Sequence, residues 1–334
     1  MQDMLDYTLI EAASEFLAPH VRRTPVERSP ALSTALGRDV WLKLENWQLT
    51  GSFKVRGALF AMSRLQLGGA TSVATCSAGN HGRGVAYAAR RLGMKAVVFV
   101  PSSVDESKVT GMVRDGAQVV KSPFPGYDKT EVWARTECAK RELPFLSAFD
   151  DDRIMAANGG SLALEVLDQV PGARHFVVPV GGGGLSAGFS FVTKHRLPES
   201  RFTAVQFDGS PALQLSLDRG EAVTELEGPE TLASGLEGGI GRSTFEVLKS
   251  RVDHVALVSE ADLRDAFRWM MAEHQMVVEG SAAVAIAACL AGNIAPESAG
   301  EGAADAALAA APLVVVVTGR NVSQDKIRSV LSGA

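Results

Sequence analysis

The sequence predicts an α/β protein made of two open, twisted, mostly parallel sheets that are covered by helices. From residue 40 onward, short apolar runs alternate with longer stretches of helical periodicity, and parallel strands need such helical crossovers. Several apolar runs end in glycine-containing loops, at the strand ends where open α/β sheets bind ligands. The alternation falls into two blocks. We therefore expect a small domain over residues 70–148 and a large domain made of residues 1–69 and 149–334.

Apolar spacing, together with Gly and Pro, predicts the elements in chain order. A first helix is expected at 8–18, ended by Pro19; residues 23–26 are extended, and a capped short helix follows at 29–37. Strands are predicted at 40–44, 73–76, 96–100, 117–120, 176–180, 203–207, 254–258 and 313–318. Helices are predicted at 55–65, 82–92, 107–115, 128–141, 160–169, 260–273 and 281–291. Residues 293–312 are rich in Ala, Gly and Glu and are expected to form a mobile surface connection or a weak helix.

Composition excludes several classes of function. The chain has 334 residues and a formal net charge of -5, so it lacks the basic field that attracts nucleic acid. Its cysteines, Cys76, Cys138 and Cys289, show neither C-x-x-C nor zinc spacing, which predicts no metal site and a reducing compartment. Neither a signal peptide nor an apolar run long enough to span a bilayer is recognisable. We expect a cytoplasmic protein without a membrane partner.

The stretch Gly51-Ser52-Phe53-Lys54-Val55-Arg56-Gly57 carries the strongest candidate for chemistry. Lys54 lies between an aromatic and a β-branched residue at the start of a helix, where partial desolvation would favour the neutral amine. Neutral amines form Schiff bases with aldehydes. A solvated lysine at a helix start is the alternative interpretation of this motif taken alone.

Three loops that follow predicted strands add to this candidate. Gly181-Gly182-Gly183-Gly184 precedes Leu185 and a helix, and such a bend lets backbone amides surround an anion, with phosphate the expected guest. It is neither a nucleoside-triphosphate loop nor a dinucleotide motif. Ser77-Ala78-Gly79-Asn80-His81-Gly82 opens a helix and suits a carboxylate, although it could be a plain capping turn. Thr318 ends the last strand, and its hydroxyl is expected to face the same crevice.

Taken together, these motifs and Thr24-Pro25, Lys43-Leu44-Glu45 and Thr318-Gly319-x-Asn321 resemble the pyridoxal-phosphate enzymes of fold type II, the tryptophan synthase β-like fold, over nearly the whole chain. The sequence is most similar to threonine/serine dehydratases and serine racemases. This resemblance implies pyridoxal phosphate in the cleft between the domains, as a Schiff base with Lys54. It also implies roles for the surrounding residues: Phe53 beneath the cofactor, Asn80 at its phenolic oxygen, Gly181, Gly182, Gly183, Gly184 and Leu185 at its phosphate, Thr318 at its pyridine nitrogen, Glu279 near the ring or substrate, and Ser77, Ala78, Gly79, Asn80 and His81 at the substrate carboxylate.

The resemblance further implies an ammonia-lyase reaction. The substrate would be a small L-β-hydroxy-α-amino acid, with threonine, serine and 3-hydroxyaspartate as candidates, and the products a 2-oxo acid and ammonia. The Lys54 amine would remove the Cα proton, and the cofactor phosphate would protonate the leaving hydroxyl. A homodimer is expected. The alternatives are a β-replacement enzyme, an amino-acid racemase, or, from another class, a non-catalytic binder of a phosphorylated small molecule.

Three positions depart from the family pattern. Ala78 stands where the racemases carry a second serine, which argues against efficient racemisation. Arg320 stands where dehydratases commonly have glycine; it could hold a second substrate carboxylate, pair with an acid such as Glu279, or face solvent. Gln206 replaces the glutamate of a divalent-cation site, so no metal is predicted. Arg320 and residues 19–25 also resemble dehydratases from hydroxyectoine-utilisation clusters.

Overall fold

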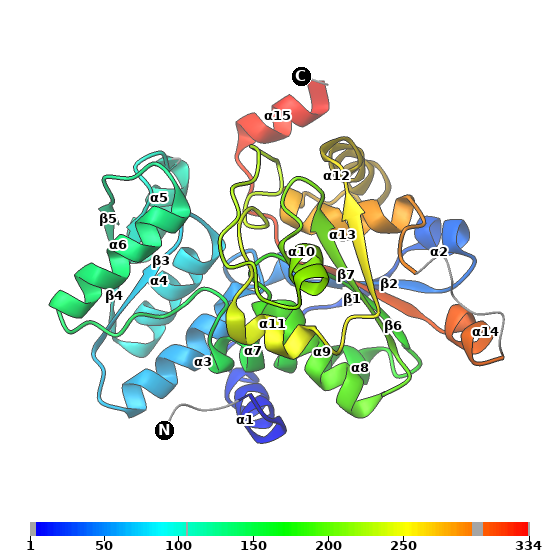
Figure 1. The fold of residues 1–334 in the computed structure, drawn as a ribbon, viewed down its shortest axis with the longest axis horizontal. Helices are drawn as coiled ribbons and strands as arrows, with labels where there is room; N and C mark the ends of the chain where they lie inside the picture. Colours follow the sequence, from blue (N-terminus) through cyan, green and yellow to red (C-terminus); the bar gives the residue numbers. More distant parts are fainter. Residues whose placement is uncertain (1–4, 105, 296–302, 333–334) are drawn as a thin grey trace.

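Two separate sheets form the framework of the molecule (Figure 1). The structure is a computed structural model that describes residues 5–104, 106–295 and 303–332. The large sheet has the strand order β1-β2-β9-β6-β7-β8, and all its pairs are parallel except β1 with β2. The small sheet is parallel, with the order β3-β4-β5. The predicted fold class is confirmed, whereas the domain boundaries at 69/70 and 148/149 stay a prediction.

The strands are β1 (Val26–Arg28), β2 (Val40–Leu44), β3 (Ser72–Cys76), β4 (Lys95–Val100), β5 (Gln118–Lys121), β6 (His175–Pro179), β7 (Arg201–Phe207), β8 (His254–Val258) and β9 (Leu313–Val317). The helices of the first half are α1 (Tyr7–Leu17), α2 (Pro30–Leu36), the 3₁₀ turn η1 (Glu45–Trp47), α3 (Lys54–Leu67), α4 (Asn80–Leu92), α5 (Glu106–Arg114), α6 (Tyr127–Lys140), α7 (Asp152–Met155), the π turn η2 (Ala156–Gly160) and α8 (Ser161–Gln169). Those of the second half are α9 (Gly184–Arg196), α10 (Ala212–Arg219), α11 (Arg242–Leu248), α12 (Glu260–His274), α13 (Gly280–Leu290), α14 (Ala303–Ala310) and α15 (Gln324–Ser332).

All eight predicted strands are present, with ends that shift by at most two residues. The extended segment 23–26 leads into β1, which the sequence did not predict as a strand. Short helices such as α10, α11 and α15 were also missed. They have seven to nine residues, little more than two helical turns, which is too short to show a clear apolar period. Within 293–312, α14 forms the final part, and residues 296–302 lie outside the described residues.

Helices cover both faces of the large sheet. In β9, Leu313, Val315 and Val317 pack into one core, and Val314 and Val316 pack into another on the opposite face. Because both faces are buried, the strand is continuously apolar instead of alternating. The core on the Val315 face is closed by the alanine-rich helix α13, which contacts β6, β7, β8 and β9. Among the described residues, no helix is both long and apolar enough to cross a membrane.

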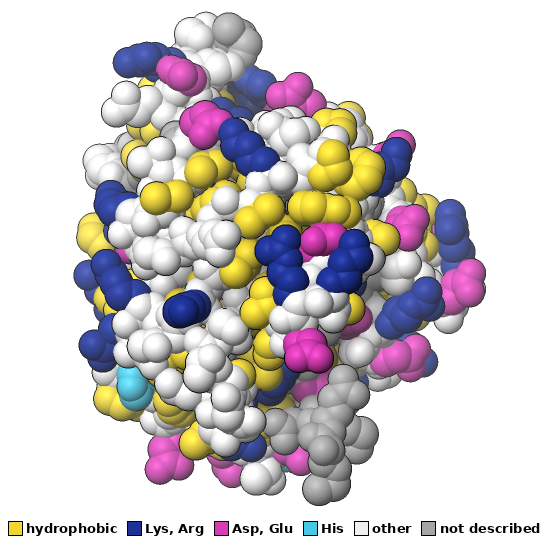
Figure 2. Space-filling model, turned by 90° about the vertical axis from the view of Figure 1, so that its left-hand side faces the viewer, with side chains coloured by type: hydrophobic (Ala, Val, Ile, Leu, Met, Phe, Trp, Pro, Cys, Tyr) yellow, Lys and Arg dark blue, Asp and Glu magenta, His cyan; other side chains and the backbone are white. Residues whose placement is uncertain are grey.

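The face that carries the small sheet has a mixed surface. Figure 2 shows basic and acidic side chains interspersed there, with hydrophobic side chains between them. The helix α6 carries close pairs of opposite charge, such as Arg135 with Glu131 at 2.6 Å and Lys140 with Glu137 at 2.8 Å. Surface pairs of this kind add little to stability.

Candidate active site

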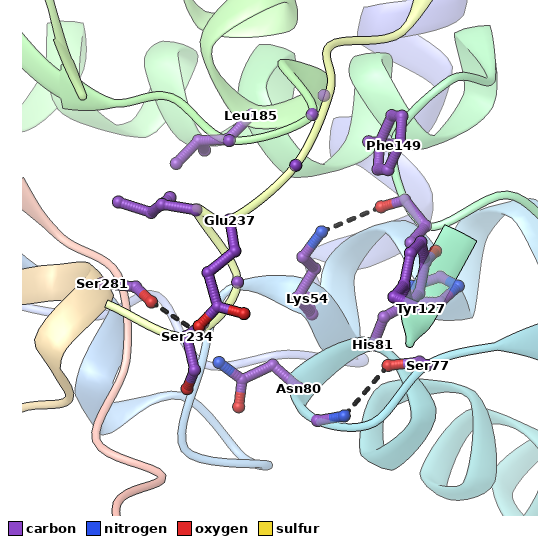
Figure 3. Close-up of a pocket in the computed structure, with 18 of the residues that line it drawn as sticks. Lys54, Ser77, Asn80, His81, Tyr127, Phe149, Leu185, Ser234, Glu237 and Ser281 are labelled. Atoms are coloured by element: carbon purple, nitrogen blue, oxygen red, sulfur yellow. Dashed lines mark hydrogen bonds between the residues drawn. The ribbon is translucent and has the colours of Figure 1, made fainter. Parts of the chain in front are cut away.

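All the predicted site residues except Arg320 line one cavity of about 350 Å³ (Figure 3). It is lined by the start of α3, the loop after β3, the glycine bend after β6, the residue that follows β9 and the start of α13. The predicted residues that line it are Phe53, Lys54, Ser77, Ala78, Gly79, Asn80, His81, Gly181, Gly182, Gly183, Gly184, Leu185, Glu279 and Thr318. Because parallel strands end at the same edge of their sheet, residues far apart in sequence reach the same cavity.

Lys54 is the first residue of α3, and its amine lies inside the cavity. Nζ donates a hydrogen bond to the Ala148 carbonyl oxygen at 2.9 Å and lies 5.2 Å from the centre of the Phe53 ring. Burial lowers the pKa of this amine to about 8, although the nearby Glu279 carboxylate acts in the opposite direction. Near neutral pH the amine is therefore uncharged far more often than an exposed lysine would be.

The turn before Lys54 is tied to the end of β9. The Phe53 amide donates to the Thr318 carbonyl oxygen at 3.2 Å, and Ser52 forms a β-bridge with Gly319. Gly51 has φ +78°, and a Cβ there would lie 2.6 Å from the Asn321 side chain. Thr318 itself is 3% exposed. These contacts hold Lys54 and Thr318 on the same side of the cavity.

The glycine bend has no room for side chains. A Cβ on Gly182 would lie 2.3 Å from the Phe149 ring, and one on Gly181 would lie 2.5 Å from the Gly235 carbonyl oxygen. Gly183 has φ +92°, and a Cβ there would lie 2.6 Å from Thr244 Oγ1. α9 begins at Gly184, so its first amides lack acceptors within the helix and suit an anion.

The loop after β3 brings polar groups to the opposite wall. Ser77 Oγ accepts a hydrogen bond from the Gly79 amide at 3.2 Å, and α4 begins at Asn80, two residues earlier than predicted. His81 is 2% exposed, and neither ring nitrogen has a hydrogen-bond partner among the described residues. Burial and the nearby Lys54 lower the pKa of His81 to about 3, so the ring is neutral.

Glu279, the residue before α13, lies on the same wall of the cavity. Its Oε1 accepts a hydrogen bond from Asn80 Nδ2 at 2.7 Å, and a Cβ on Gly319 would lie 2.3 Å from the same oxygen. Burial raises the pKa of Glu279 to about 7, with the Asn80 hydrogen bond acting against that shift. The carboxyl is therefore partly protonated near neutral pH.

Arg320 is the predicted site residue that the structure does not place in the cavity. Its side chain is exposed, with the guanidinium 5.5 Å from the centre of the Trp47 ring, and its amide donates to the Gly51 carbonyl oxygen at 2.9 Å. The exposed position agrees with the solvent-facing alternative stated for Arg320, whereas its role toward a substrate stays a prediction.

Gln206 has a structural role at the end of β7. Its Oε1 accepts hydrogen bonds from the amides of Leu213 at 3.0 Å and Gln214 at 3.1 Å, so it holds the start of α10. Within the described ranges, no group of three or more His, Cys, Asp or Glu side chains is arranged to hold a metal ion.

Several cavity residues were not predicted from the sequence. They are Lys108, Tyr127, Glu131, Phe149, Thr224, Ser281 and the segment Ser234-Gly235-Leu236-Glu237-Gly238-Gly239. This segment lies between α10 and α11 and has no strand or helix periodicity. The feature of the sequence that could have revealed this segment is its glycine content. Gly235 and Gly238 adopt φ +111° and +114°, values that residues with side chains rarely adopt.

Comparison with known proteins agrees with this geometry. The chain matches the family described as pyridoxal-phosphate dependent enzyme over residues 17–319. It is 38% identical over 291 residues to the L-threonine ammonia-lyase of Geobacter sulfurreducens, covering 86% of this chain and 71% of that protein. Among solved structures, maize serine racemase superposes with TM-score 0.88 at 26% identity, covering 99% of this chain and 98% of that one. The T.th. threonine deaminase superposes with TM-score 0.83 at 33% identity, covering 95% of this chain and 99% of that one.

These matches span nearly the whole chain and include both sheets. The predicted resemblance to fold type II enzymes and the predicted cofactor are confirmed, whereas the hydroxyectoine-utilisation branch stays a prediction. The chain belongs to the family of pyridoxal-phosphate dependent enzymes.

Proposed function

We propose that this chain is an ammonia-lyase that converts L-serine or L-threonine to a 2-oxo acid and ammonia by α,β-elimination. The observation that carries the proposal is the Lys54 amine, which lies in the cavity with a pKa lowered to about 8. An amine near this pKa can both bond to an aldehyde and accept a proton close to neutral pH. The names of the relatives, L-threonine ammonia-lyase and threonine deaminase, support the same reaction.

The cavity fits pyridoxal phosphate. The bend at Gly181–Gly184 has no side chains, and it leads into the amino end of α9, which suits the phosphate. Asn80 and Thr318 offer neutral polar groups, and the unpartnered ring of His81 lines the same cavity. When bound, the cofactor supplies the electron sink for the Cα–H electrons. Because Thr318 is a neutral partner, it would leave the pyridine nitrogen largely unprotonated.

The protein's own groups would then bind the substrate and move its protons. The amides and side chains of the loop from Ser77 to His81 would hold the α-carboxylate at the start of α4. The Lys54 amine would take the proton from Cα. It would remain close to Cα, because its contacts with the Ala148 carbonyl oxygen and the Phe53 ring hold it at the cavity wall. His81 is neutral, so it would contact the carboxylate through a ring N–H and not as a cation. These roles are carried over from the family motif, and mutagenesis tests them.

The described lining of the cavity favours monocarboxylic substrates. It contains the carboxyl groups of Glu131, Glu237 and Glu279 and the amines of Lys54 and Lys108, but no arginine. A second substrate carboxylate would meet three acids and would lack the paired donors that a guanidinium provides. Serine and threonine are therefore better candidates than 3-hydroxyaspartate.

We expect kcat/KM for serine or threonine to exceed that for either 3-hydroxyaspartate diastereomer by about tenfold or more, the effect of roughly 1.4 kcal/mol, because a second carboxylate lacks paired donors in the described lining. The measurement is 2-oxo acid formation over a series of substrate concentrations. Arg320→Gly should leave this ratio within about twofold of wild type, because the guanidinium lies outside the cavity. Loss of activity toward the diacids alone in that variant would return Arg320 to the substrate site.

Two other reactions can be separated from elimination by their products. Racemisation needs an acid on the face of the cofactor opposite Lys54, and Ala78, which lines the cavity, has no proton to give. We expect D-serine formation from L-serine to be at least about 100-fold slower than 2-oxo acid formation, since a missing general acid costs that much. β-Replacement would give a thioether when a thiol donor is added.

A homodimer is proposed on the family resemblance, and sedimentation velocity tests it.

The pH dependence of cofactor binding tests the state of Lys54. Only the neutral amine attacks the aldehyde, and burial lowers the pKa of Lys54 to about 8. The rate of cofactor association with the apoprotein should therefore rise about fivefold between pH 7 and pH 8 and by only about twofold more above pH 8. Stopped-flow absorbance between pH 7 and 10 measures this rate. A rate that still rises about sevenfold between pH 9 and 10 would show an ordinary lysine pKa instead.

A further inference from the structure

A chain of hydrogen bonds runs from helix α4 to the cavity through two carboxamides. Arg83 Nη1 donates to Asn321 Oδ1, and Asn321 Nδ2 donates to Asn80 Oδ1 at 2.6 Å and to the Thr50 carbonyl oxygen at 2.9 Å. Asn80 Nδ2 in turn donates to Glu279 Oε1 at 2.7 Å. Figure 3 shows the Asn80 side chain among the groups that line the cavity, near Glu237 and below Lys54.

The direction of this chain is fixed at its outer end. A carboxamide has an acceptor end and a donor end of nearly the same shape, so its hydrogen-bond partners decide which way it faces. A guanidinium can only donate and a carbonyl can only accept. Arg83 therefore holds Asn321 Oδ1 toward itself, and the Thr50 carbonyl holds Nδ2 on the other side. With Asn321 fixed, only the Oδ1 of Asn80 can accept from it.

The inner end of the chain cannot fix Asn80 by itself. Glu279 has a pKa raised by burial to about 7, so near neutral pH it is an acceptor in one protonation state and a donor in the other. A protonated Glu279 could donate to Oδ1 of a reversed Asn80. The contact to Asn321 removes this ambiguity. The Asn80 Nδ2 group has two protons, of which one goes to Glu279 and the second is left for the cavity.

Tight packing around both ends keeps the side chains in place. A Cβ on Gly51 would lie 2.6 Å from Asn321 Oδ1, and a Cβ on Gly319 would lie 2.3 Å from Glu279 Oε1. The absence of a Cβ at these two glycines therefore lets Asn321 and Glu279 lie where they contact Asn80.

We propose that Asn321, oriented by Arg83 and the Thr50 carbonyl, is a positioning residue that makes Asn80 present an N–H donor to the ring oxygen of pyridoxal phosphate. The proposal rests on the proposed function, because the contact between Asn80 and that oxygen belongs to the cofactor site. Asn321 is not among the described residues that line the cavity. Its effect passes through the direction in which the Asn80 carboxamide faces.

Asn321→Asp is the sharpest test, because it keeps the shape and the contact with Arg83 while replacing the donor at Asn80 by an acceptor. Asn80 should then reverse and turn its oxygen toward the cofactor. We expect the dissociation constant of pyridoxal phosphate, titrated by its visible absorption with apoprotein, to rise about tenfold or more, as for a lost hydrogen bond to a charged group. The wavelength of the visible band should shift as well.

Substitutions of Arg83 test the outer end. Arg83→Met should raise the same dissociation constant about three- to tenfold, and Arg83→Lys, which keeps a donor, should restore most of the affinity. Arg90→Met is the matched control, since Arg90 lies on the same helix and faces Asp115 at 3.5 Å. It should bind the cofactor as wild type does. The melting temperature of each apoprotein, measured by circular dichroism, shows that the variants are folded.

The double variant Asn80→Ala/Asn321→Asp separates this role from a general structural one. If Asn321 acts through Asn80, the Asn321→Asp substitution should cause no further loss of cofactor affinity in a protein that already carries Asn80→Ala. An equal loss in both backgrounds, or wild-type affinity in Asn321→Asp, overturns the proposal. In those cases the proposed function still stands if the wild type binds pyridoxal phosphate at Lys54. A wild type that binds no cofactor, or binds it elsewhere, refutes both.

Discussion

Replacing Lys54 with alanine is expected to lower the rate of ammonia release by about 10⁴-fold or more, because one side chain both bonds the cofactor and moves the Cα proton. The structure supports this dual use. The amine lies in the cavity beside the Ala148 carbonyl, and burial lowers its pKa to about 8. A coupled assay that consumes the 2-oxo acid measures the rate in both proteins.

Borohydride reduction of the wild-type holoprotein, followed by peptide mapping, locates the covalent bond. We expect one modified lysine, Lys54. Lys95→Ala, which removes an exposed lysine at the start of β4, controls for nonspecific effects and should keep wild-type activity. A cofactor adduct on another lysine, or ammonia release that survives in Lys54→Ala, would contradict the proposed mechanism.

Arg56→Met is expected to lower the free energy of unfolding by about 3–5 kcal/mol, the usual cost of leaving a buried charge unpaired. The Arg56 and Glu45 side chains are both fully buried. Arg56 contacts Glu45 Oε1 at 2.8 Å and Glu165 Oε1 at 2.7 Å, and Lys43 Nζ contacts Glu165 Oε2 at 2.7 Å. Without the guanidinium, two carboxylates would share only the Lys43 ammonium. Urea unfolding monitored by circular dichroism measures the difference.

The difference between the two proteins should narrow as the pH falls from 7 to 4. In the wild type, burial raises the pKa of Glu45, but Arg56, with help from Lys43 and Thr24, brings it below the usual carboxyl value. The contribution of Glu45 to stability is therefore present above the ordinary carboxyl pKa and is lost as pH falls through the lowered one. In Arg56→Met, burial without the partner should raise that pKa, so acid would favour the folded state. Arg91→Met, on an exposed position of α4, should change stability by less than about 0.5 kcal/mol at either pH. A difference that widens in acid would contradict this account.

The sequence by itself determined the framework and the centre of the site. The continuous apolar runs predicted the strands, because both faces of the sheet are buried, and this leaves a local signal in each run. The glycine bend at Gly181–Gly184 and the lysine after Gly51-Ser52-Phe53 were also visible locally, since close backbone packing and a positive φ can be met only by glycine. The ends of parallel strands meet at one edge, so the gathering of these loops could be predicted as well.

Only the tertiary structure decided which partners these residues have. It placed Arg320 over Trp47 outside the cavity, brought the segment that carries Glu237 into the cavity, and buried Arg56 with acids from two other parts of the chain. No local pattern encodes such contacts. They depend on how elements far apart in sequence pack, whereas periodicity and turn chemistry act over only a few neighbouring residues.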